Sequence, residues 1–279
     1  MKMGVFLSVI LWAWVLTVGA KNIEPRFDGK KITNDVFWNT AEGMPLYSQG
    51  GGIFRYPDPD TGRLRYYWYG VRYAEAVRYR EDPSVTFPIT YPACTFEAVT
   101  CYSSDDLINW YYEGDVLTRE EVDRYGRAGW VGRMGVAYLE AWNQYVLVVQ
   151  HDNGVLFALS HTPNGRFTWH RRITMEKIIG TPNTGDQTVF VDEDTRKPYL
   201  IYSYGRGRNR IYVSEIGIRD GQVDLLDCTQ VFKGAGREGN CLFKYEGRYY
   251  MCASNLYGWD SSFAYYMVAN EIRGHYEPA

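Results

Sequence analysis

The stretch GDQTVFVDEDTRKPYLIYSYG, residues 185–205, contains the unit from which the fold of this 279-residue chain can be inferred. A short apolar strand follows the polar start, DEDTRKP has the composition of a hairpin turn, and an aromatic-rich strand comes next. Because a single hairpin is only marginally stable in water, this unit is expected to pack against others of its kind.

Three further stretches repeat the same parts, namely an apolar strand, a tight turn, an aromatic strand and a third strand that ends in small residues. They begin GGGIFRY, GRMGVAYL and REGNCLFKY. Their spacing is close to 50 residues, except where residues 71–92 are inserted into the first copy. Repeats of about 50 residues built from several strands are typical of β-propellers. We therefore predict an all-β chain folded as a β-propeller, with about four blades present.

In such a blade the first strand begins, and the second strand ends, on the same rim of the propeller. The residues three positions before the first aliphatic residue in the first three copies are Gly50, Arg133 and Asp186. Glu238 holds the similar place in the fourth copy, so these four residues are expected around this rim. A carboxylate that opens an apolar strand is costly to bury, which favours a functional role. A turn carboxylate at Asp186 and a surface ion pair between Glu238 and Arg237 are the plainer alternatives. Strand alternation argues against the second, because adjacent residues face opposite sides.

Two carboxylates across a pocket lined by aromatic rings are the equipment of a glycosidase, in which an acid protonates the leaving oxygen and a base activates water. The chain is rich in such rings, with 16% aromatic residues. Aromatic and polar side chains of the same rim are the predicted substrate-binding set. This set comprises Gln49, Gly50, Trp68, Arg133, Gln187, Tyr257 and Trp259.

The carboxylates and aromatic rings of this rim predict an oligosaccharide or polysaccharide as the partner. The net charge of −3 gives no support to nucleic-acid binding or to attraction by a membrane surface. The four histidines lack metal-ligand spacing and no Cys/His zinc pattern occurs, while Asp192 and Asp194 fit turn chemistry. We therefore predict no metal site and no required cofactor.

The chain begins with the parts of a secretory signal: Lys2, an apolar run over residues 5–16, and small residues up to Ala20. The apolar run is too short to span a bilayer, which needs roughly 20 residues. The sequence thus predicts a signal peptide over residues 1–20 cleaved after Ala20, a secreted or periplasmic protein, and no membrane insertion after cleavage. A lead-in segment is expected over residues 21–46, and a propeller catalytic domain, C-terminally incomplete, over residues 47–279.

Two of the five cysteines can be placed relative to each other. If Glu246 and Gly247 form the turn of CLFKYEGRYYMC, Cys241 and Cys252 lie directly opposite on a hairpin. Either a disulfide or two buried thiols fits this placement.

The third and fourth copies resemble a known family. GDQTVFVDEDTRKPYLIY is similar to the third-blade segment of glycoside hydrolase family 43, and REGNCLFKYEGRYYMCAS resembles its fourth-blade motif. QGGGIFR and the late SNLYGWDSS are similar to the branch that includes exo-β-1,3-galactanases. The resemblance runs from about Tyr47 to the end of the chain, and it implies a five-bladed propeller with inverting hydrolysis.

The resemblance also implies roles for the two carboxylates. Glu238 takes the place of the general acid, and Asp186 that of the residue that tunes the acid and orients the substrate. The place of the first-blade base falls at Gly50, which has no carboxylate, and the galactanase-like branch uses an amide of its fifth blade instead. This chain differs from that branch in two further positions, with Arg133 near the second-blade glutamate and Gln49 in place of a histidine. A structural calcium occurs in some members of the family.

The sequence therefore predicts a secreted glycosidase for terminal or side-chain sugars of plant-type galactan or arabinogalactan. An exo-galactanase, an arabinofuranosidase and a xylosidase all fit the motifs. The alternative is a carbohydrate-binding or vestigial propeller without catalysis, which the missing first-blade carboxylate favours.

Overall fold

A computed structural model describes residues 31–85, 95–126, 129–258 and 261–278. The predicted signal peptide, Cys94 and Trp259 lie outside the described residues. Within the described ranges, sixteen strands form four separate four-stranded antiparallel sheets, each built from strands that follow one another in the chain. The prediction of an all-β propeller with four blades is confirmed.

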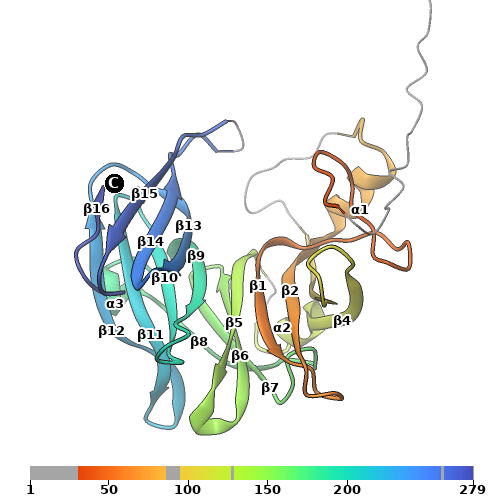
Figure 1. Ribbon diagram of the computed structural model, residues 1–279, viewed down its shortest axis with the longest axis horizontal. Coiled ribbons are helices and arrows are strands. Elements are labelled where there is room, and N and C mark those ends of the chain that lie inside the picture. Colours follow the sequence, from red (N-terminus) through yellow and green to blue (C-terminus); the bar gives the residue numbers. More distant parts are fainter. Residues whose placement is uncertain (1–30, 86–94, 127–128, 259–260, 279) are drawn as a thin grey trace, which may run out of the picture.

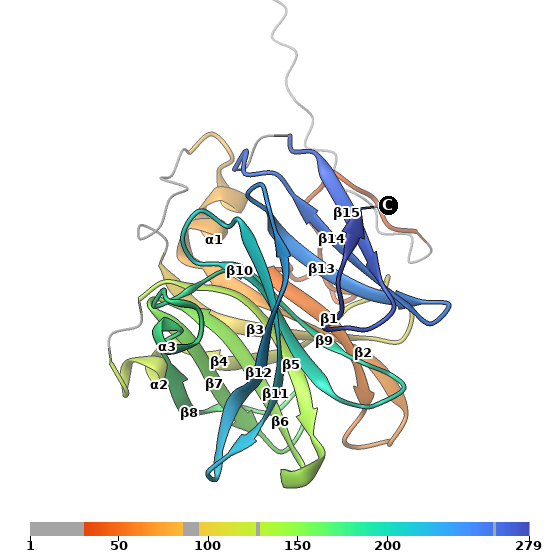
Figure 2. The ribbon, with the colours of Figure 1, turned by 90° about the vertical axis from the view of Figure 1, so that its left-hand side faces the viewer.

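Figures 1 and 2 show the four blades following one another in chain order, with the first strand of each blade toward the middle. Contacts join the inner strands β1 to β5, β5 to β9 and β9 to β13. The strands of blade 1 are β1 (Gln49–Pro57), β2 (Leu64–Tyr73), β3 (Phe96–Ser104) and β4 (Tyr111–Thr118). Those of blade 2 are β5 (Val131–Leu139), β6 (Gln144–His151), β7 (Gly154–Ser160) and β8 (Thr168–Ile173).

Blade 3 consists of β9 (Thr184–Val191), β10 (Pro198–Tyr204), β11 (Arg210–Arg219) and β12 (Gln222–Lys233). Blade 4 consists of β13 (Glu238–Tyr245), β14 (Arg248–Ser254), β15 (Ala264–Ala269) and β16 (Glu277–Pro278). The helices are short and connect or flank the blades: α1 (Ala74–Glu81), α2 (Arg119–Asp123), α3 (Glu176–Ile179) and the 3-10 turn η1 (Glu140–Trp142). The stretch that the sequence identified as inserted into the first copy contains the end of β2 and α1.

Strand alternation explains how blades stack. In β6, Leu147 and Val149 pack toward blade 1, whereas Val146 and Val148 pack toward blade 3. A central blade is thus buried on both faces, which explains why residues 145–149, YVLVV, are continuously apolar. A third cluster, which includes Leu242, joins blade 4 to blade 3.

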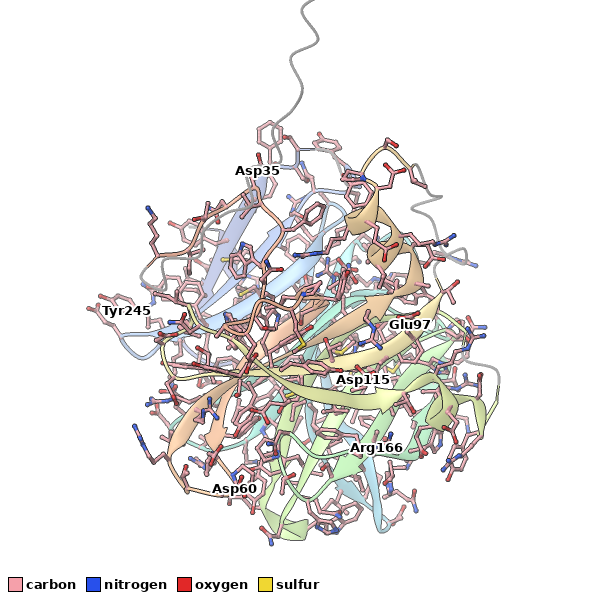
Figure 3. All side chains as sticks on the ribbon, turned by 90° about the vertical axis from the view of Figure 1, so that its right-hand side faces the viewer. Asp35, Asp60, Glu97, Asp115, Arg166 and Tyr245 are labelled. Atoms are coloured by element: carbon pink, nitrogen blue, oxygen red, sulfur yellow. The ribbon has the colours of Figure 1, made fainter. Side chains whose placement is uncertain are left out.

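The outer face of blade 4 is different, because its apolar side chains are uncovered by the described residues. Phe243 is 46% exposed and Tyr245, at the tip of the β13–β14 hairpin in Figure 3, is 59% exposed. Cys241 and Cys252 lie opposite each other on this face, as predicted, and both are free thiols. Cys241 is exposed, so the alternative of two buried thiols is wrong for this residue.

The described part of the lead-in segment packs on the outer face of blade 1. The backbone N–H of Ala41 donates a hydrogen bond of 2.8 Å to the carbonyl of Trp110, and the ring of Trp38 lies edge-on to Trp68 with centroids 5.9 Å apart. The segment therefore acts as part of the propeller. No helix among the described residues is long and apolar enough to cross a membrane.

Candidate active site

Each inner strand begins with a β-bulge, in which two residues lie opposite one residue of the next strand. In β1 the pairing skips from Gln49 to Gly52, so Gly50 and Gly51 lie opposite Gly70. The other inner strands skip in the same way, between Val131 and Met134, between Thr184 and Gln187, and between Glu238 and Cys241. The four bulges lie at the same end of the four blades.

The bulges share a sequence pattern in which glycine comes first. These glycines are Gly50, Gly132, Gly185 and Gly239, and they are followed by Gly51, Arg133, Asp186 and Asn240. The expected equivalence of Gly50, Asp186 and Glu238 is therefore wrong: Gly51 is the counterpart of Asp186, and Gln49 is the counterpart of Glu238. Spacing from the first aliphatic residue could not reveal this, because one residue separates the bulge from that aliphatic residue in blades 1 and 4, and two residues separate them in blades 2 and 3.

Asp186 lies in the bulge of blade 3 and is held from two neighbouring blades. The Nε of Arg133, from blade 2, lies 3.0 Å from its Oδ2, and the backbone N–H of Gly239, from blade 4, donates to the same oxygen at 3.0 Å. Asn240 Nδ2 donates to the Asp186 carbonyl at 3.0 Å. The structure thus brings Arg133 and Asp186 together, with both carboxylate contacts on one oxygen.

Glu238 opens β13, and 22% of its side chain is exposed. Its Oε2 lies 3.1 Å from Nε of Arg208, in the turn between β10 and β11. Burial, and after it the negative charge of Asp186, raise the pKa of Glu238 above its usual 4.5 although Arg208 and Arg133 act to lower it. A carboxyl with a raised pKa beside a second carboxylate has the properties of a general acid.

Two buried side chains that the sequence analysis missed tie the bulges together. Gln150, opposite the bulge of blade 2, donates from Nε2 to the carbonyls of Thr184 (3.1 Å) and Gly185 (2.8 Å) in blade 3. Ser203, opposite the bulge of blade 3, donates to the carbonyl of Arg237 in blade 4 at 2.7 Å. The shared glycine pattern was the sequence signal that could have pointed to these positions.

Gln187 is not available to a sugar, contrary to expectation. It is 2% exposed, its Nε2 donates to the Arg133 carbonyl at 3.3 Å, and its Oε1 accepts from Thr184 Oγ1 at 3.0 Å. Its position in the inner strand, just beyond the bulge, turns it into the interface between blades 2 and 3. Gln187 therefore positions Arg133 and does not bind hydroxyls.

Two glycines of the run in β1, Gly50 and Gly51, are required for different physical reasons. Gly50 has φ +69°, a conformation that favours glycine, and lies beside the stem of Arg133, whose Cγ would be 3.8 Å from a Cβ. A Cβ on Gly51 would lie 1.6 Å from the carbonyl oxygen of Tyr69 in β2. The bare backbone thus allows β2 to approach β1. Gln49 is exposed at the same end of the strand.

The structure places two of the predicted aromatic platforms, Trp68 and Tyr257, in different parts of the molecule. Trp68 packs among Trp38, Tyr102 and Trp110 on the outer face of blade 1, so its expected place in the sugar site is wrong. It faces outward because its neighbours Tyr67 and Tyr69 face blade 2. Tyr257 is exposed in the β14–β15 connection, which begins at the end of β14 opposite Glu238.

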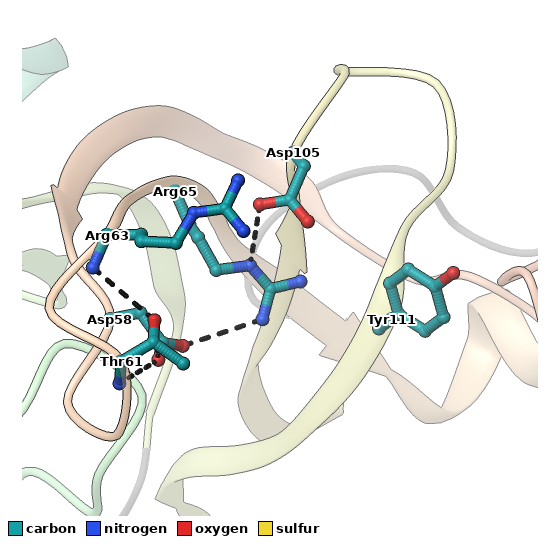
Figure 4. Close-up of a pocket in the computed structure, with 6 residues that line it drawn as sticks. All are labelled: Asp58, Thr61, Arg63, Arg65, Asp105 and Tyr111. Atoms are coloured by element: carbon teal, nitrogen blue, oxygen red, sulfur yellow. Dashed lines mark hydrogen bonds and ion pairs between the residues drawn. The ribbon is translucent and has the colours of Figure 1, made fainter.

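A hollow of about 430 Å³ lies at the opposite end of blade 1, around the β1–β2 turn (Figure 4). Its arginine Arg65 is already paired with Asp105 at 3.1 Å and with Asp58 at 3.5 Å. Asp58 in turn caps the turn by accepting from Thr61. This hollow is separate from the carboxylates. The described residues contain no group of three or more His, Cys, Asp or Glu placed to hold a metal ion.

Comparisons with known proteins agree with the propeller fold. The exo-β-1,3-galactanase of Clostridium thermocellum is 26% identical, with a TM-score of 0.69 over 88% of this chain and 50% of that one. The exo-β-1,3-galactanase of Phanerochaete chrysosporium, solved with galactose, is 22% identical, with a TM-score of 0.68 over 88% of this chain and 52% of that one. A β-xylosidase of Formosa agariphila is 28% identical over 169 residues, which are 53% of this chain and 27% of that protein.

The chain spans about half the length of these two solved galactanases. The family model for glycosyl hydrolases family 43 matches residues 74–279, which include the bulges of blades 2, 3 and 4 with both carboxylates. The chain therefore belongs to glycosyl hydrolases family 43.

Proposed function

We propose that this protein is an exported glycoside hydrolase that removes terminal or side-chain sugars from galactan- or arabinogalactan-like polysaccharides. Family membership supports hydrolysis of a glycosidic bond, and the similar galactanases support a galactosyl substrate. Relatives have been solved with galactose and with β-1,3-galactotriose, which supports an oligosaccharide ligand. The signal-like first 20 residues support export.

The observation that carries this proposal is the environment of Glu238. Its carboxyl is partly buried and lies beside Asp186, and both effects favour the protonated form. A protonated carboxyl can donate its proton to the glycosidic oxygen as the bond breaks, which is general acid catalysis. Asp186 stays in place through Arg133 and the Gly239 N–H, so its charge acts on Glu238 from a fixed point.

Inversion at the anomeric carbon requires a base on the opposite face of the sugar. Gly51, the blade 1 counterpart of Asp186, has no side chain, so this position supplies no base. The stereochemical part of the proposal is tested by following the anomer first released, using proton NMR during hydrolysis. An initial product with retained configuration would contradict inversion.

The test of the acid is Glu238→Gln, measured on two aryl β-galactosides that differ in leaving group. With a poor leaving group the rate should fall by about 10²- to 10⁴-fold, which is the usual contribution of a general acid. With 2,4-dinitrophenolate, which leaves without a proton, the loss should be much smaller. Glu140→Gln, at the opposite end of blade 2, is the matched control and should leave both rates unchanged. Equal losses on both substrates would refute the assigned role.

A second function is favoured by the bare first-blade position. A carbohydrate-binding propeller would bind galactose oligosaccharides with this rim and hydrolyse none of them. Calorimetric binding of β-1,3-galactotriose by the wild-type chain, without any release of galactose over days, would support this alternative.

A further inference from the structure

Arg208 places a positive charge beside Glu238, the proposed general acid, although a general acid does not need a cation next to it. Its Nε is 3.1 Å from Oε2 of Glu238, and a guanidinium at this distance stabilises the ionised carboxylate. A general acid must instead be protonated when substrate is bound. Burial and the charge of Asp186 already raise the pKa of Glu238 against the effect of Arg208. A substrate group that neutralised Arg208 would favour the protonated acid further.

The charges of the site make this requirement specific. Arg133 and Asp186 neutralise each other at 3.0 Å. Arg208 and Glu238 do the same while Glu238 is ionised. Once Glu238 carries its proton, these four side chains have a net charge of +1, and Arg208 is the cation without a charged partner among them.

Arg208 is also held in a position from which it can bind an added anion. Its backbone has φ +50°, a strained conformation for a residue other than glycine, and its carbonyl accepts from the Arg237 N–H at 2.9 Å. Its stem crosses the bulge, with Cγ 3.2 Å from where a Cβ of Gly185 would be. Its Nε is buried and makes no well-aligned hydrogen bond with the described residues. This Nε faces Glu238, so an added anion would reach the guanidinium through its other nitrogens, which donate no hydrogen bond to a described residue; 32% of the side chain is exposed.

We propose that the sugar bound next to Glu238 carries an anionic group, a carboxylate or a sulfate ester, and that Arg208 binds this group. The guanidinium forms paired hydrogen bonds with planar or tetrahedral oxyanions, which neutral hydroxyl groups cannot match in strength. The bound anion pairs with the positive charge of Arg208, which then stabilises ionised Glu238 less and so favours the protonated form of Glu238. An anionic sugar would then favour the reactive state of the acid, whereas a neutral sugar would leave the ion pair intact.

This inference rests on the proposed function for its catalytic meaning, but its test is a binding measurement that needs no turnover. Isothermal titration of the full chain with D-galactose, D-galacturonate and D-galactose 6-sulfate compares one neutral and two anionic ligands. At least one anionic sugar should bind about 10- to 100-fold more tightly than galactose, as expected for hydrogen bonds to a charged group. The two anionic arms distinguish a carboxylate from a sulfate ester.

Arg208→Gln should reduce this preference about tenfold or more, and Arg208→Lys should keep part of it because the charge remains. Arg196→Gln is the matched control: Arg196 also has a left-handed φ, +62°, but lies in the β9–β10 turn at the other end of blade 3. The control should retain the full preference. Circular dichroism melting of all variants confirms that the propeller is folded, and Arg208→Lys decides if the glutamine variant does not fold.

The proposal is overturned if neither anionic sugar binds more tightly than galactose, or if Arg208→Gln shows the same preference as the control and wild type. Where the glutamine variant does not fold, an undiminished preference in Arg208→Lys overturns it. Hydrolysis of matched aryl galactosides and galacturonides is then measured separately. Anion-selective binding without hydrolysis would sink the glycosidase function and support the anion site. Hydrolysis with a preference for the neutral galactoside would support the glycosidase function and contradict the anion site.

Discussion

At the scale of single residues, the site depends on two carboxylates, Asp186 and Glu238, that lie in different electrostatic environments. Asp186 is ion-paired with Arg133 and accepts a hydrogen bond from the Gly239 N–H, so two neighbouring blades hold its carboxylate in place. Glu238 is partly buried and near that charge, so its pKa is raised. The two groups are therefore suited to complementary roles, one as a fixed negative charge and the other as a proton donor.

The role of Asp186 can be tested by Asp186→Asn. Removing its negative charge should lower the pKa of Glu238, because that charge is the second contribution that raises it. Since activity requires protonated Glu238, the fall of kcat/KM at higher pH should begin at a lower pH in the variant. A pH profile between 4 and 9 measures the shift, and Asp194→Asn, on the exposed β9–β10 turn, is the control. An unchanged profile would contradict the tuning role.

At the scale of elements, the bulge at the start of each inner strand determines which side chains reach the rim. In blade 1 this bulge needs Gly51, because β2 passes so close that its Tyr69 carbonyl occupies the space of a side chain. A hairpin built from the same residues without the bulge would turn the following side chains to the opposite face.

Gly51→Ala is therefore expected to destabilise the protein by at least about 2 kcal/mol, since β1 and β2 must separate to admit the methyl group. Gly62 lies in the turn of the same hairpin, and no atom lies within 4 Å of the position of an added Cβ. In Gly62→Ala, only the φ of +70° disfavours the alanine. Its cost should be about 1 kcal/mol. Urea unfolding compares the stability of the two variants. Equal midpoints would show that separating β1 and β2 adds no cost beyond that of an ordinary turn substitution.

The turn between β9 and β10 joins two blades through Asp192, which is 1% exposed. Its carboxylate accepts from the backbone N–H of Asp194 and Thr195, from the Tyr249 hydroxyl and from Lys244 of blade 4. Burial alone would raise the pKa of Asp192, but these donors outweigh it and hold the pKa below 3.8.

Because this folded-state pKa is depressed, Asp192 contributes stability that is fully present above about pH 4 and is lost as pH falls through the folded value. Asp192→Asn should cost about 1–3 kcal/mol at pH 7 and should weaken the acid dependence of stability. Asp194→Asn, 74% exposed and paired only at the surface with Lys244, should cost at most about 1 kcal/mol. Urea unfolding at pH 3, 4 and 7 tests both, and parallel pH curves for wild type and Asp192→Asn would contradict the linkage.

At the scale of the whole molecule, stability comes from three apolar clusters, each shared by two neighbouring blades. Leu147 is fully buried between blades 1 and 2, whereas Phe243 lies on the open outer face of blade 4. Leu147→Ala should destabilise by about 2–5 kcal/mol through the cavity it leaves. Phe243→Ala should cost less than about 1 kcal/mol, because little surface is buried there. Thermal and urea unfolding would measure both, and a similar cost for the two would show that the outer face is covered in solution.

Several features followed from the sequence because they depend on local chemistry. The repeat of hairpins predicted the propeller and its blade order, and the DEDTRKP turn was correctly identified by its composition. The opposition of Cys241 and Cys252 followed from counting out from a two-residue turn. The closeness of Arg133 and Asp186 followed from placing both at the start of inner strands.

Other features depended on which face a side chain takes and on contacts between blades, and these only the tertiary structure decided. The register of the bulges shifted the equivalence from Gly50 to Gly51 and turned Gln187 into an interface between blades. Strand alternation left Trp68 on an outer face. Arg208 reaches Glu238 from a different blade, across a turn whose left-handed backbone no apolar pattern could indicate. The sequence by itself thus determined the repeating element and the identity of the two carboxylates, since strands and turns form from neighbouring residues. The register of the bulges, and with it the composition of the site, was decided only when four separate segments packed around a common rim.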